Sequence, residues 1–572
     1  MLNRHRVSRA LMLRAAVLGV FTGWLAACEH APAVAPTQST LPSAGAASVA
    51  TLPALRAPEA AFVALANQLP SSAGFFYDRN DDLVVLVTDT SDGQHAAAAV
   101  RQLVATRSIA LSPEKSRSPR IRVLIASYSF RQLSAWRDSI GNYVDNTAGA
   151  GVAWLDVDEE ANRLTLGVLG SANRSALLAA ARRMGVDANA VRFRDSEQGH
   201  LDVGRVASTS TASAASEHYG ATALRRRTTT SITSSQSTLI GGLEIGLWAG
   251  ADGGACTAGF AVKHYSSGVT KSGILTASHC THTTFGFDGD SMSQNSAGTK
   301  VGREYHDPSY YQCGLFHCRP SDAAFIATNA GVSIGLGQVA KWAGGGYDSL
   351  TYDNTSSWVV TRAGSDNVYV GTQTSWVGRT TGFHSGVRVT NTCVDFWLDI
   401  LLKTTCAMVD SLPASAGGDS GGPVFVILNA GNEIQAVGTV SGHIDAYHMY
   451  WSQVSRAGND FTAENSTLTF NPATISAPTL SGSVDGSNHP ALSWTSVAGV
   501  LTYSVFRFDY DASCNSTTSG TGYLGSTTLT AFGDASVTVG GGPGCPHSQY
   551  WVTASTATQF SGPSNLVTFT TP

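Results

Sequence analysis

The first part of the chain alternates short apolar runs with helical patterns. Apolar runs of strand length, rich in β-branched residues or alternating with polar ones, occur at residues 83–88, 121–126, 151–158 and 163–168. Alanine-rich or amphipathic stretches typical of helices occur at residues 95–107, 130–140 and 175–184. This alternation predicts that residues 58–205 form one α+β unit.

Helical periodicity fades in the rest of the chain. Residues 206–236 are rich in Ser, Thr and Ala and include Arg225-Arg226-Arg227, a composition typical of an exposed linker. From Thr238 to about residue 470, short β-branched runs alternate with Gly, Asn, Asp and Ser turns, which predicts a β-barrel or β-sandwich. Beyond a boundary near residues 471–473, residues 476–572 are expected to form a separate small β-sandwich.

The N-terminus has the pattern of an export signal. Four arginines precede an apolar run at residues 15–27, which is too short to span a bilayer but suits the core of a signal peptide. The run ends in Leu25-Ala26-Ala27-Cys28, which resembles the lipobox of bacterial lipoproteins, and an ordinary cleavage site is the alternative. We therefore expect residues 1–28 to be a signal peptide, Cys28 to be lipidated and residues 29–57 to be a tether, so that the precursor lies in the bacterial cell envelope.

Composition narrows the classes of function. Charged residues are 13% of the 572 residues and hydrophobic residues 43%, and 36 basic against 41 acidic residues give a net charge of −5. Such a chain is not disordered throughout, and the absence of a long basic run argues against nucleic acid as a partner. Apart from Cys28 there are eight cysteines, which indicates disulfides in an exported chain, because no C-x-x-C pair typical of zinc sites occurs.

Two short blocks carry the residue types that acyl transfer needs. Thr276-Ala277-Ser278-His279-Cys280 follows one apolar run, and Gly418-Asp419-Ser420-Gly421-Gly422-Pro423 precedes another. Acyl transfer requires a nucleophile, a base, a carboxylate that orients the base, and N–H donors for the oxyanion. The glycines can present Ser420 as the nucleophile on a tight turn, with His279 as its base and the N–H groups of Gly418 and Ser420 as the oxyanion hole.

The orienting carboxylate must be chosen among four aspartates between the two blocks, which are Asp288, Asp290, Asp307 and Asp322. Asp288 and Asp290 lie in a glycine-rich turn, and Asp307 precedes a proline. Asp322 begins a run of small and then apolar residues that can enter a core, and the mechanism requires a buried Asp beside the imidazole. The sequence therefore predicts Asp322, and the three residues follow in the chain order His, Asp, Ser.

These blocks resemble those of the chymotrypsin-fold serine endopeptidases, and most of all the bacterial α-lytic protease and streptogrisin group. Residues 238–244 (TLIGGLE) resemble the mature N-terminus of that group, and Cys256 with Cys280 resembles the disulfide beside its catalytic His. Residues 378–386 (GRTTGFHSG) resemble a stretch of its second barrel, and Val440-Ser441-Gly442 resembles its substrate-pairing strand. The resemblance implies a mainly β chain whose residues 237–470 form a double β-barrel protease domain.

The flanking regions resemble other parts of the same group of proteins. Residues 119–200 resemble the C-terminal part of its pro-region, so residues 58–205 are expected to serve as folding catalyst and inhibitor of the protease. Residues 476–572 resemble a fibronectin type III module. Because the linker 206–236 precedes the stretch that resembles a mature N-terminus, we expect a maturation cut near Gln236-Ser237.

The cysteines depart from the group's pattern. Ala414 and Ser385 stand where that group usually or often has a Cys, which leaves the shape of the specificity pocket open. Pairing between neighbours within one predicted domain gives the disulfides Cys256–Cys280, Cys313–Cys318, Cys393–Cys406 and Cys514–Cys545. The first of these pairs is also the one that the resemblance implies.

The resemblance also implies which residues bind substrate, and these are Ser415, Val440, Ser441, Gly442 and His443. The residues expected to line the primary pocket are Ala414, Ser415, Val440 and His443. None of these side chains is acidic, which argues against a preference for Arg or Lys. His443 can accept an acidic or amide side chain or simply narrow the pocket, and the sequence does not choose between these roles.

The interpretation that follows is an exported serine endopeptidase made as a zymogen, a monomer that hydrolyses proteins or peptides without metal or cofactor. Two other classes stay open. A surface adhesin without catalytic activity would use the C-terminal sandwich as its working part. An α/β-hydrolase esterase would share the G-x-S-x-G string and could use His443 or His448, but it requires alternating strands and helices.

Overall fold

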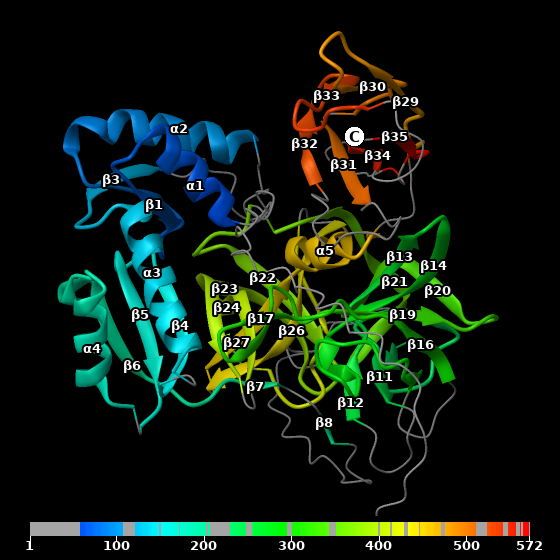
Figure 1. Ribbon diagram of the computed structural model, residues 1–572. Coiled ribbons are helices and arrows are strands. Elements are labelled where there is room, and N and C mark those ends of the chain that lie inside the picture. The colour runs from blue at the N-terminus through cyan, green and yellow to red at the C-terminus, as the bar shows by residue number, and fades with distance from the viewer. Residues whose placement is uncertain are drawn as a thin grey trace, which may run out of the picture. The chain divides into compact units, whose positions relative to one another are not determined.

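The computed structural model describes residues 58–106, 120–147, 150–170, 172–201, 204–205, 229–247, 254–294, 300–342, 350–365, 367–398, 401–411, 415–427, 433–445, 447–470, 475–500, 502–510, 523–540, 547–555, 561 and 564–570. All of these residues belong to one compact unit, and strands predominate among them (Figure 1). The fold is therefore mainly β, as predicted. Cys28 and the segments predicted as signal peptide and tether lie outside the described residues.

The N-terminal α+β region, residues 58–205, repeats one order of elements. Each repeat consists of a helix, two antiparallel strands, a second helix and a strand that is parallel to its neighbour. The two repeats follow each other directly in the chain. The elements are α1 Pro58–Gln68, β1 Ser72–Tyr77, β2 Leu83–Val87, α2 Gly93–Thr106, β3 Ile121–Ile125, α3 Phe130–Asp145, β4 Val152–Asp158, β5 Arg163–Val168, α4 Arg174–Arg183 and β6 Val191–Asp195. The strands and helices predicted for this region are confirmed, and α3 extends five residues beyond its predicted end.

Helix α3 is amphipathic and packs on the strands that follow it (Figure 1). Its buried side chains Phe130, Leu133, Ile140 and Val144 recur at helical spacing. They join Leu155 and Leu166 of the β4–β5 hairpin in one hydrophobic core. Two very short strands, β7 His200–Leu201 and β8 Gly204–Arg205, end the region.

The central β region, residues 229–470, contains most of the remaining strands. They are β9 Thr229–Ser231, β10 Thr238–Gly241, β11 Glu244–Leu247, β12 Gly254–Thr257, β13 Phe260–Ser266, β14 Val269–Thr276, β15 Ser291–Ser293, β16 Lys300–His306, β17 Tyr311–Cys313, β18 Phe316–Arg319, β19 Ala324–Thr328, β20 Ser333–Trp342, β21 Thr351–Ala363, β22 Gln373–Gly378, β23 Gly382–Trp397, β24 Leu402–Asp410, β25 Pro423–Ile427, β26 Glu433–Asp445, β27 His448–Gln453 and β28 Ser466–Thr469. One helix, α5 Val454–Ala463, lies between the last two strands.

Two large sheets organise this region, and besides the cores described next, one hydrophobic cluster contains side chains from both sheets, among them Phe260 and Phe425. A 9-stranded sheet contains β11 to β16 and β19, and a 16-stranded sheet contains β22 to β27. The first sheet encloses side chains that include Ile245, Ala261, Ile274, Met292 and Ile326. The second encloses Trp376, Val389, Met408, Val424 and Trp451. Strand β4 of the N-terminal region joins the second sheet through β23, where Phe396 pairs with Trp154.

Two expectations for this region need correction. Residues 229–236 are not an exposed linker: β9 pairs with β21, and Ile232 is buried in the same core as Leu239. The single apolar side chain of this segment, Ile232, is buried, so the linker prediction is too long at its C-terminal end. Helix α5 was not predicted, although the buried residues Val454, Ala457 and Phe461 follow helical spacing.

The C-terminal β region, residues 475–570, forms two small antiparallel sheets. Its strands are β29 Leu480–Val484, β30 Pro490–Trp494, β31 Thr502–Tyr510, β32 Tyr523–Thr527, β33 Ala531–Gly533, β34 His547–Ser555 and β35 Val567–Thr570. Trp494, Tyr550 and Phe569 share one hydrophobic core. The β structure predicted for residues 476–572 is confirmed over the described residues of this region. Residues 471–474, where the boundary was predicted, lie outside the described residues.

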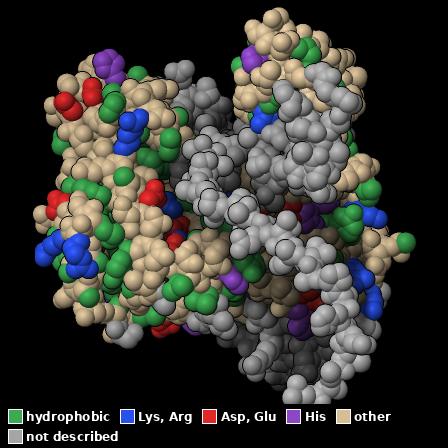
Figure 2. Space-filling view, in the orientation of Figure 1, with side chains coloured by type: hydrophobic (Ala, Val, Ile, Leu, Met, Phe, Trp, Pro, Cys, Tyr) green, Lys and Arg blue, Asp and Glu red, His purple; other side chains and the backbone are tan. Residues whose placement is uncertain are grey.

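Charge is sparse on the described surface. On the coloured part of the face in Figure 2, basic side chains occur in small separate groups. Among the described residues no helix is both long enough and apolar enough to cross a membrane.

Candidate active site

Ser420 lies in a glycine-rich turn that leads into β25. The turn needs its glycines: Gly418 and Gly421 have φ of +103° and +79°, in the left-handed region. A Cβ at Gly418 would lie 2.6 Å from Thr380 Oγ1, and one at Gly421 would lie 2.0 Å from Thr276 Oγ1. The second contact brings the end of β14, and with it His279, against the turn that carries Ser420.

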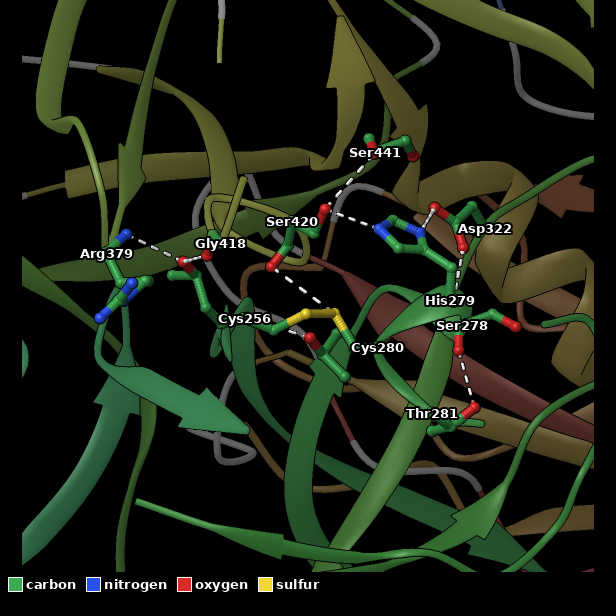
Figure 3. Close-up of a disulfide and its surroundings, with 12 residues drawn as sticks. Cys256, Ser278, His279, Cys280, Thr281, Asp322, Arg379, Gly418, Ser420 and Ser441 are labelled. Atoms are coloured by element: carbon green, nitrogen blue, oxygen red, sulfur yellow. Dashed lines mark hydrogen bonds and ion pairs between the residues drawn. A yellow bond between two sulfur atoms is a disulfide. The ribbon is translucent and has the colours of Figure 1, made fainter. Parts of the chain in front are cut away.

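His279 lies between the other two residues of the predicted triad (Figure 3). It occupies one turn of 3₁₀ helix directly after β14, and Asp322 lies two residues before β19. The Nε2 atom of His279 is 2.6 Å from Ser420 Oγ, and its Nδ1 atom is 2.6 Å from Asp322 Oδ2. The backbone N–H of His279 also donates to Asp322 Oδ1 at 3.1 Å. The three side chains therefore form one continuous hydrogen-bonded chain.

The other three candidate aspartates, Asp288, Asp290 and Asp307, form hydrogen bonds to loop residues and not to the imidazole of His279. Asp307 Oδ2 accepts a hydrogen bond from Ser278 Oγ at 2.6 Å, and Asp307 pairs with the buried Arg319. Asp290 bonds to the exposed His282, and Asp288 accepts from the backbone of Thr283. Of the four candidates considered, the structure brings Asp322 to His279.

The carboxylate of Asp322 stays ionised although it is fully buried. Burial by itself raises the pKa of Asp322, but the nearby His279, its two hydrogen bonds and the Arg319 guanidinium outweigh that effect and lower the pKa. Arg319 is itself 1% exposed and is held by Asp307 and by Asp460 of α5. A cation and two further carboxylates therefore surround the Asp322–His279 pair.

The turn that carries Ser420 is braced by Asp419. This side chain is buried and accepts hydrogen bonds from the N–H groups of Ala416, Thr380 and Thr381 and from the Thr381 hydroxyl. Burial nevertheless raises the pKa of Asp419 to about 6. Among the described residues, the N–H groups of Gly418 and Ser420 donate to no protein acceptor, as an oxyanion hole requires.

The predicted substrate strand runs past the nucleophile as part of β26. Ser420 Oγ also donates to the carbonyl oxygen of Ser441 at 3.4 Å (Figure 3). Ser441 Oγ bonds to Ser452 Oγ at 3.1 Å, and Ser452 Oγ accepts the N–H of Asp322. Of the remaining predicted residues, Ser415 Oγ donates to the carbonyl of Gly442 at 3.0 Å, and Val440 is fully buried in the second core. Ala414 lies outside the described residues.

Strand β7 of the N-terminal region lies next to this site, and the triad is buried. Ser420, His279 and Asp322 are 0%, 3% and 0% exposed. Strand β7 pairs antiparallel with β26, where Leu201 faces Gly442 and His200 faces His443. Sequence analysis did not find His200 and Leu201, nor did it find Arg319, Ser452 and Asp460. Their roles depend on contacts between segments that are distant in the sequence, and no local pattern marks such contacts.

Three of the four predicted disulfides are present, and they are Cys256–Cys280, Cys313–Cys318 and Cys393–Cys406. Cys514 and Cys545 lie outside the described residues. The Cys256–Cys280 bridge lies directly beside His279 and Ser420 (Figure 3). It ties the chain next to His279 to β12, whose Thr257 N–H donates to the Ser420 carbonyl at 2.8 Å.

Two of the stretches that carry the family resemblance contact each other in the structure. Arg379 of the 378–386 stretch pairs with Glu244 of the 238–244 stretch at 2.9 Å. Comparison with protein-family models finds no match, and comparison with curated proteins finds none either.

Proposed function

We propose that the chain is an exported serine endopeptidase of the chymotrypsin fold, made as a zymogen. The observation that carries the proposal is the hydrogen-bonded chain from Ser420 through His279 to Asp322, with 2.6 Å at both links of the imidazole. A hydroxyl, an imidazole and an ionised buried carboxylate in this order form the constellation that activates serine for acyl transfer.

The arrangement of the two large sheets supports a double β-barrel. His279 and Asp322 follow β14 and precede β19 of the 9-stranded sheet, whereas Ser420 precedes β25 of the 16-stranded sheet. The triad thus draws its residues from segments next to both sheets, as the two barrels of this fold require. The Cys256–Cys280 bridge and the Glu244–Arg379 pair fit the same interpretation.

In the proposed mechanism each residue acts at a stated atom. Ser420 Oγ attacks the carbonyl carbon of the scissile bond while His279 Nε2 takes its proton, and His279 then protonates the leaving amine. Asp322 holds the Nδ1 proton and thereby the imidazole tautomer. The N–H groups of Gly418 and Ser420 stabilise the oxyanion, and a water molecule then hydrolyses the acyl-enzyme.

The N-terminal region would act as the pro-region of this enzyme. Its strand β7 occupies the edge of β26 on which a substrate would pair, and the triad is buried. The α/β-hydrolase alternative is not favoured, because that fold has its catalytic His after the nucleophile in the chain. The imidazole that bonds to Ser420 belongs to His279, which precedes Ser420, and His448 bonds to Asp445 instead.

A serine-directed sulfonyl fluoride tests the proposal against a silent adhesin. The mature wild-type protein should be labelled on Ser420 and should lose its hydrolysis of casein. Ser420→Ala should remain folded, take no label and lose about 10⁶ in turnover. Retention of a tenth of the activity by this variant, or an unlabelled wild-type protein without protease activity, would rule the proposal out.

A further inference from the structure

One buried arginine, Arg319, holds the backbone on both sides of Asp322. It is the last residue of β18, and its side chain is 1% exposed. Its Nε atom donates to the carbonyl oxygen of Ser321 at 2.6 Å, and its Nη2 atom donates to the carbonyl oxygen of Ala323. One guanidinium therefore fixes the two peptide groups that flank the carboxylate of the triad.

The same guanidinium also connects to the segment that carries His279. Its Nη1 atom donates to Asp307 Oδ1, and the other oxygen of Asp307 accepts the Ser278 hydroxyl at 2.6 Å. Ser278 directly precedes His279 in the turn of 3₁₀ helix (Figure 3). A continuous set of hydrogen bonds therefore joins the segment around Asp322 to the residue next to the imidazole.

These three residues, Arg319, Asp307 and Ser278, form what we name the arginine bridge. They are 1%, 2% and 0% exposed, so water does not compete for their hydrogen bonds. Phe285 closes the bridge on itself: its N–H donates to Ser278 Oγ at 2.7 Å, and its ring centroid lies 5.0 Å from the Arg319 Cζ atom. Movement of one member is thereby opposed by the others.

The arrangement uses the shape of the guanidinium. Its three nitrogens donate in different directions, and Nη1 reaches the carbonyl oxygen of Pro308 at 2.5 Å in addition to Asp307. A lysine has a single nitrogen and cannot form this planar fork. A buried ion pair contributes little net stability, because the cost of desolvation offsets its attraction. We therefore expect the bridge to act on geometry more than on the free energy of unfolding.

Helix α5 supports both ends of the arginine bridge. Asp460 Oδ2 accepts the Ser321 hydroxyl at 2.5 Å and lies 3.8 Å from Arg319 Nε. One turn further along, Glu464 accepts the backbone N–H of Ser309 at 2.7 Å, two residues beyond the aspartate of the bridge. The segments that carry the arginine and the aspartate are thus held on the same helix.

We propose, resting on the function proposed above, that Arg319 is a positioning residue of the triad. Asp322 and His279 belong to different segments, which lie next to β19 and β14, and their direct contact consists of two hydrogen bonds. The arginine bridge is a second connection between the same two segments, so it restricts rotation about the first. It thereby aligns the imidazole with Ser420.

Loss of this alignment should slow the chemical step without weakening substrate binding. Misplacement of a reacting group by about 1 Å can cost about 10²-fold in rate. No residue of the arginine bridge belongs to β26, the strand on which a substrate would pair. We therefore expect kcat to fall in bridge variants while KM stays near its wild-type value.

Steady-state kinetics per active site test the proposal. Mature enzyme is prepared from the full chain, its sites are counted by sulfonyl fluoride labelling carried to completion, and kcat and KM are measured on one casein-derived peptide that the wild-type enzyme cleaves. Arg319→Lys should lower kcat per labelled site about 10- to 100-fold, with KM changed less than about twofold. Ser278→Ala, which removes fewer bonds, should lower it about 3- to 10-fold. The double variant should lose little more than Arg319→Lys alone, because both changes interrupt one bridge.

Two matched controls change buried residues outside the arginine bridge. Ser293 of β15 is 1% exposed, and its hydroxyl donates to the carbonyl oxygen of Gly246 at 3.4 Å. Arg507 of the C-terminal β region pairs with Asp534 at 2.7 Å. Ser293→Ala and Arg507→Lys should keep the wild-type kcat per labelled site even where they lower the unfolding midpoint.

Each outcome decides one of the two proposals. If the wild-type enzyme is labelled and cleaves the peptide, but the bridge variants keep kcat per labelled site or change only KM, the inference is wrong while the protease assignment stands. A double variant whose loss equals the product of the two single losses would also contradict the bridge. If Arg319→Lys yields no mature protein, Ser278→Ala decides by the same criteria. If the wild-type protein is neither labelled nor active on casein, the protease assignment fails and the inference fails with it.

Discussion

Asp322 contacts His279 at two points, one through each of its carboxylate oxygens. One of its oxygens faces the imidazole Nδ1 of His279 and the other accepts the backbone N–H of the same residue. This double contact fixes both the position of the ring and the nitrogen that holds the proton. Removal of the charge should therefore leave the fold intact and present the wrong tautomer to Ser420.

The variant Asp322→Asn tests this role. Turnover of the mature enzyme should fall by about 10⁴ while the unfolding midpoint changes little. Asp290→Asn is the matched control, because Asp290 bonds to the exposed His282 in the same half of the molecule and should leave turnover unchanged. A damaging Asp290→Asn beside a nearly active Asp322→Asn would show that the carboxylate was chosen wrongly.

Local sequence was informative about residues but not about their long-range partners. His279 and Ser420 were found because each follows or precedes an apolar run and is flanked by small residues that a tight site requires. The apolar residues after Asp322 indicate that it enters a core. The structure agrees with this prediction, because Asp322 is fully buried. Arg319 and Ser452 were not found, since their roles depend on which distant segments come together.

At the scale of elements, the junction between β4 and β23 holds an unusual group of buried carboxyls. Asn391 donates to Asp156 at 2.6 Å, and Thr392 donates to Glu159 at 2.6 Å. Burial and the neighbouring Asp158 charge raise the pKa of Asp156 to about 8. The hydrogen bond from Asn391 and the charges of Arg137 and Arg194 lower this pKa but do not outweigh the first two effects. Burial and the Asp156 charge also raise the pKa of Glu159.

These carboxyls should make the stability of the precursor depend on pH. In the unfolded chain both carboxyls ionise near pH 4, whereas in the folded chain the pKa of Asp156 is raised to about 8 and the pKa of Glu159 is also raised. The folded state thus binds more protons across this window, so the free energy of unfolding should fall as the pH rises from about 4 to 8.

Thermal unfolding of uncut Ser420→Ala protein between pH 5 and 9 measures this dependence. The midpoint should fall with rising pH, and Glu159→Gln, which cannot ionise, should flatten the fall. Its exposed neighbour gives the control Glu160→Gln, which should keep the parent slope. A midpoint that rises over this range, or an identical slope in Glu159→Gln, would contradict the argument.

The elements predicted best are those whose periodicity is local. The β4–β5 hairpin and helices α2, α3 and α4 were recognised from their own patterns. Strands β7 and β8 have two residues each and carry no pattern, because only their pairing with β26 and β12 makes them strands. The segment 229–236 looked like a linker because its Ser and Thr residues are polar, and a single apolar side chain, Ile232, anchors it.

At the scale of the whole molecule, the N-terminal region completes the sheet of the region it covers. Strand β4 pairs with β23, and Asp145 of α3 accepts from Trp397 at 2.7 Å and pairs with Lys403 of β24 at 3.1 Å. Arg137 of α3 pairs with Asp395 at 3.0 Å. The β23–β24 hairpin therefore meets strands and charges of the N-terminal region along its length.

This arrangement predicts how the chain folds. A region built from strands that pair across long sequence distances folds slowly, because those strands must meet before any contact stabilises them. We predict that the α+β region folds first and presents β4 to the β23–β24 hairpin, which supplies part of that sheet in advance. Residues 206–572 refolded alone should therefore recover little activity, and addition of residues 29–205 should restore it. Double replacement of Asp145 and Arg137 by Asn and Gln should weaken this rescue, whereas the exposed Glu160→Gln should not. Efficient refolding of 206–572 without help, measured as casein hydrolysis per labelled Ser420, would contradict the prediction.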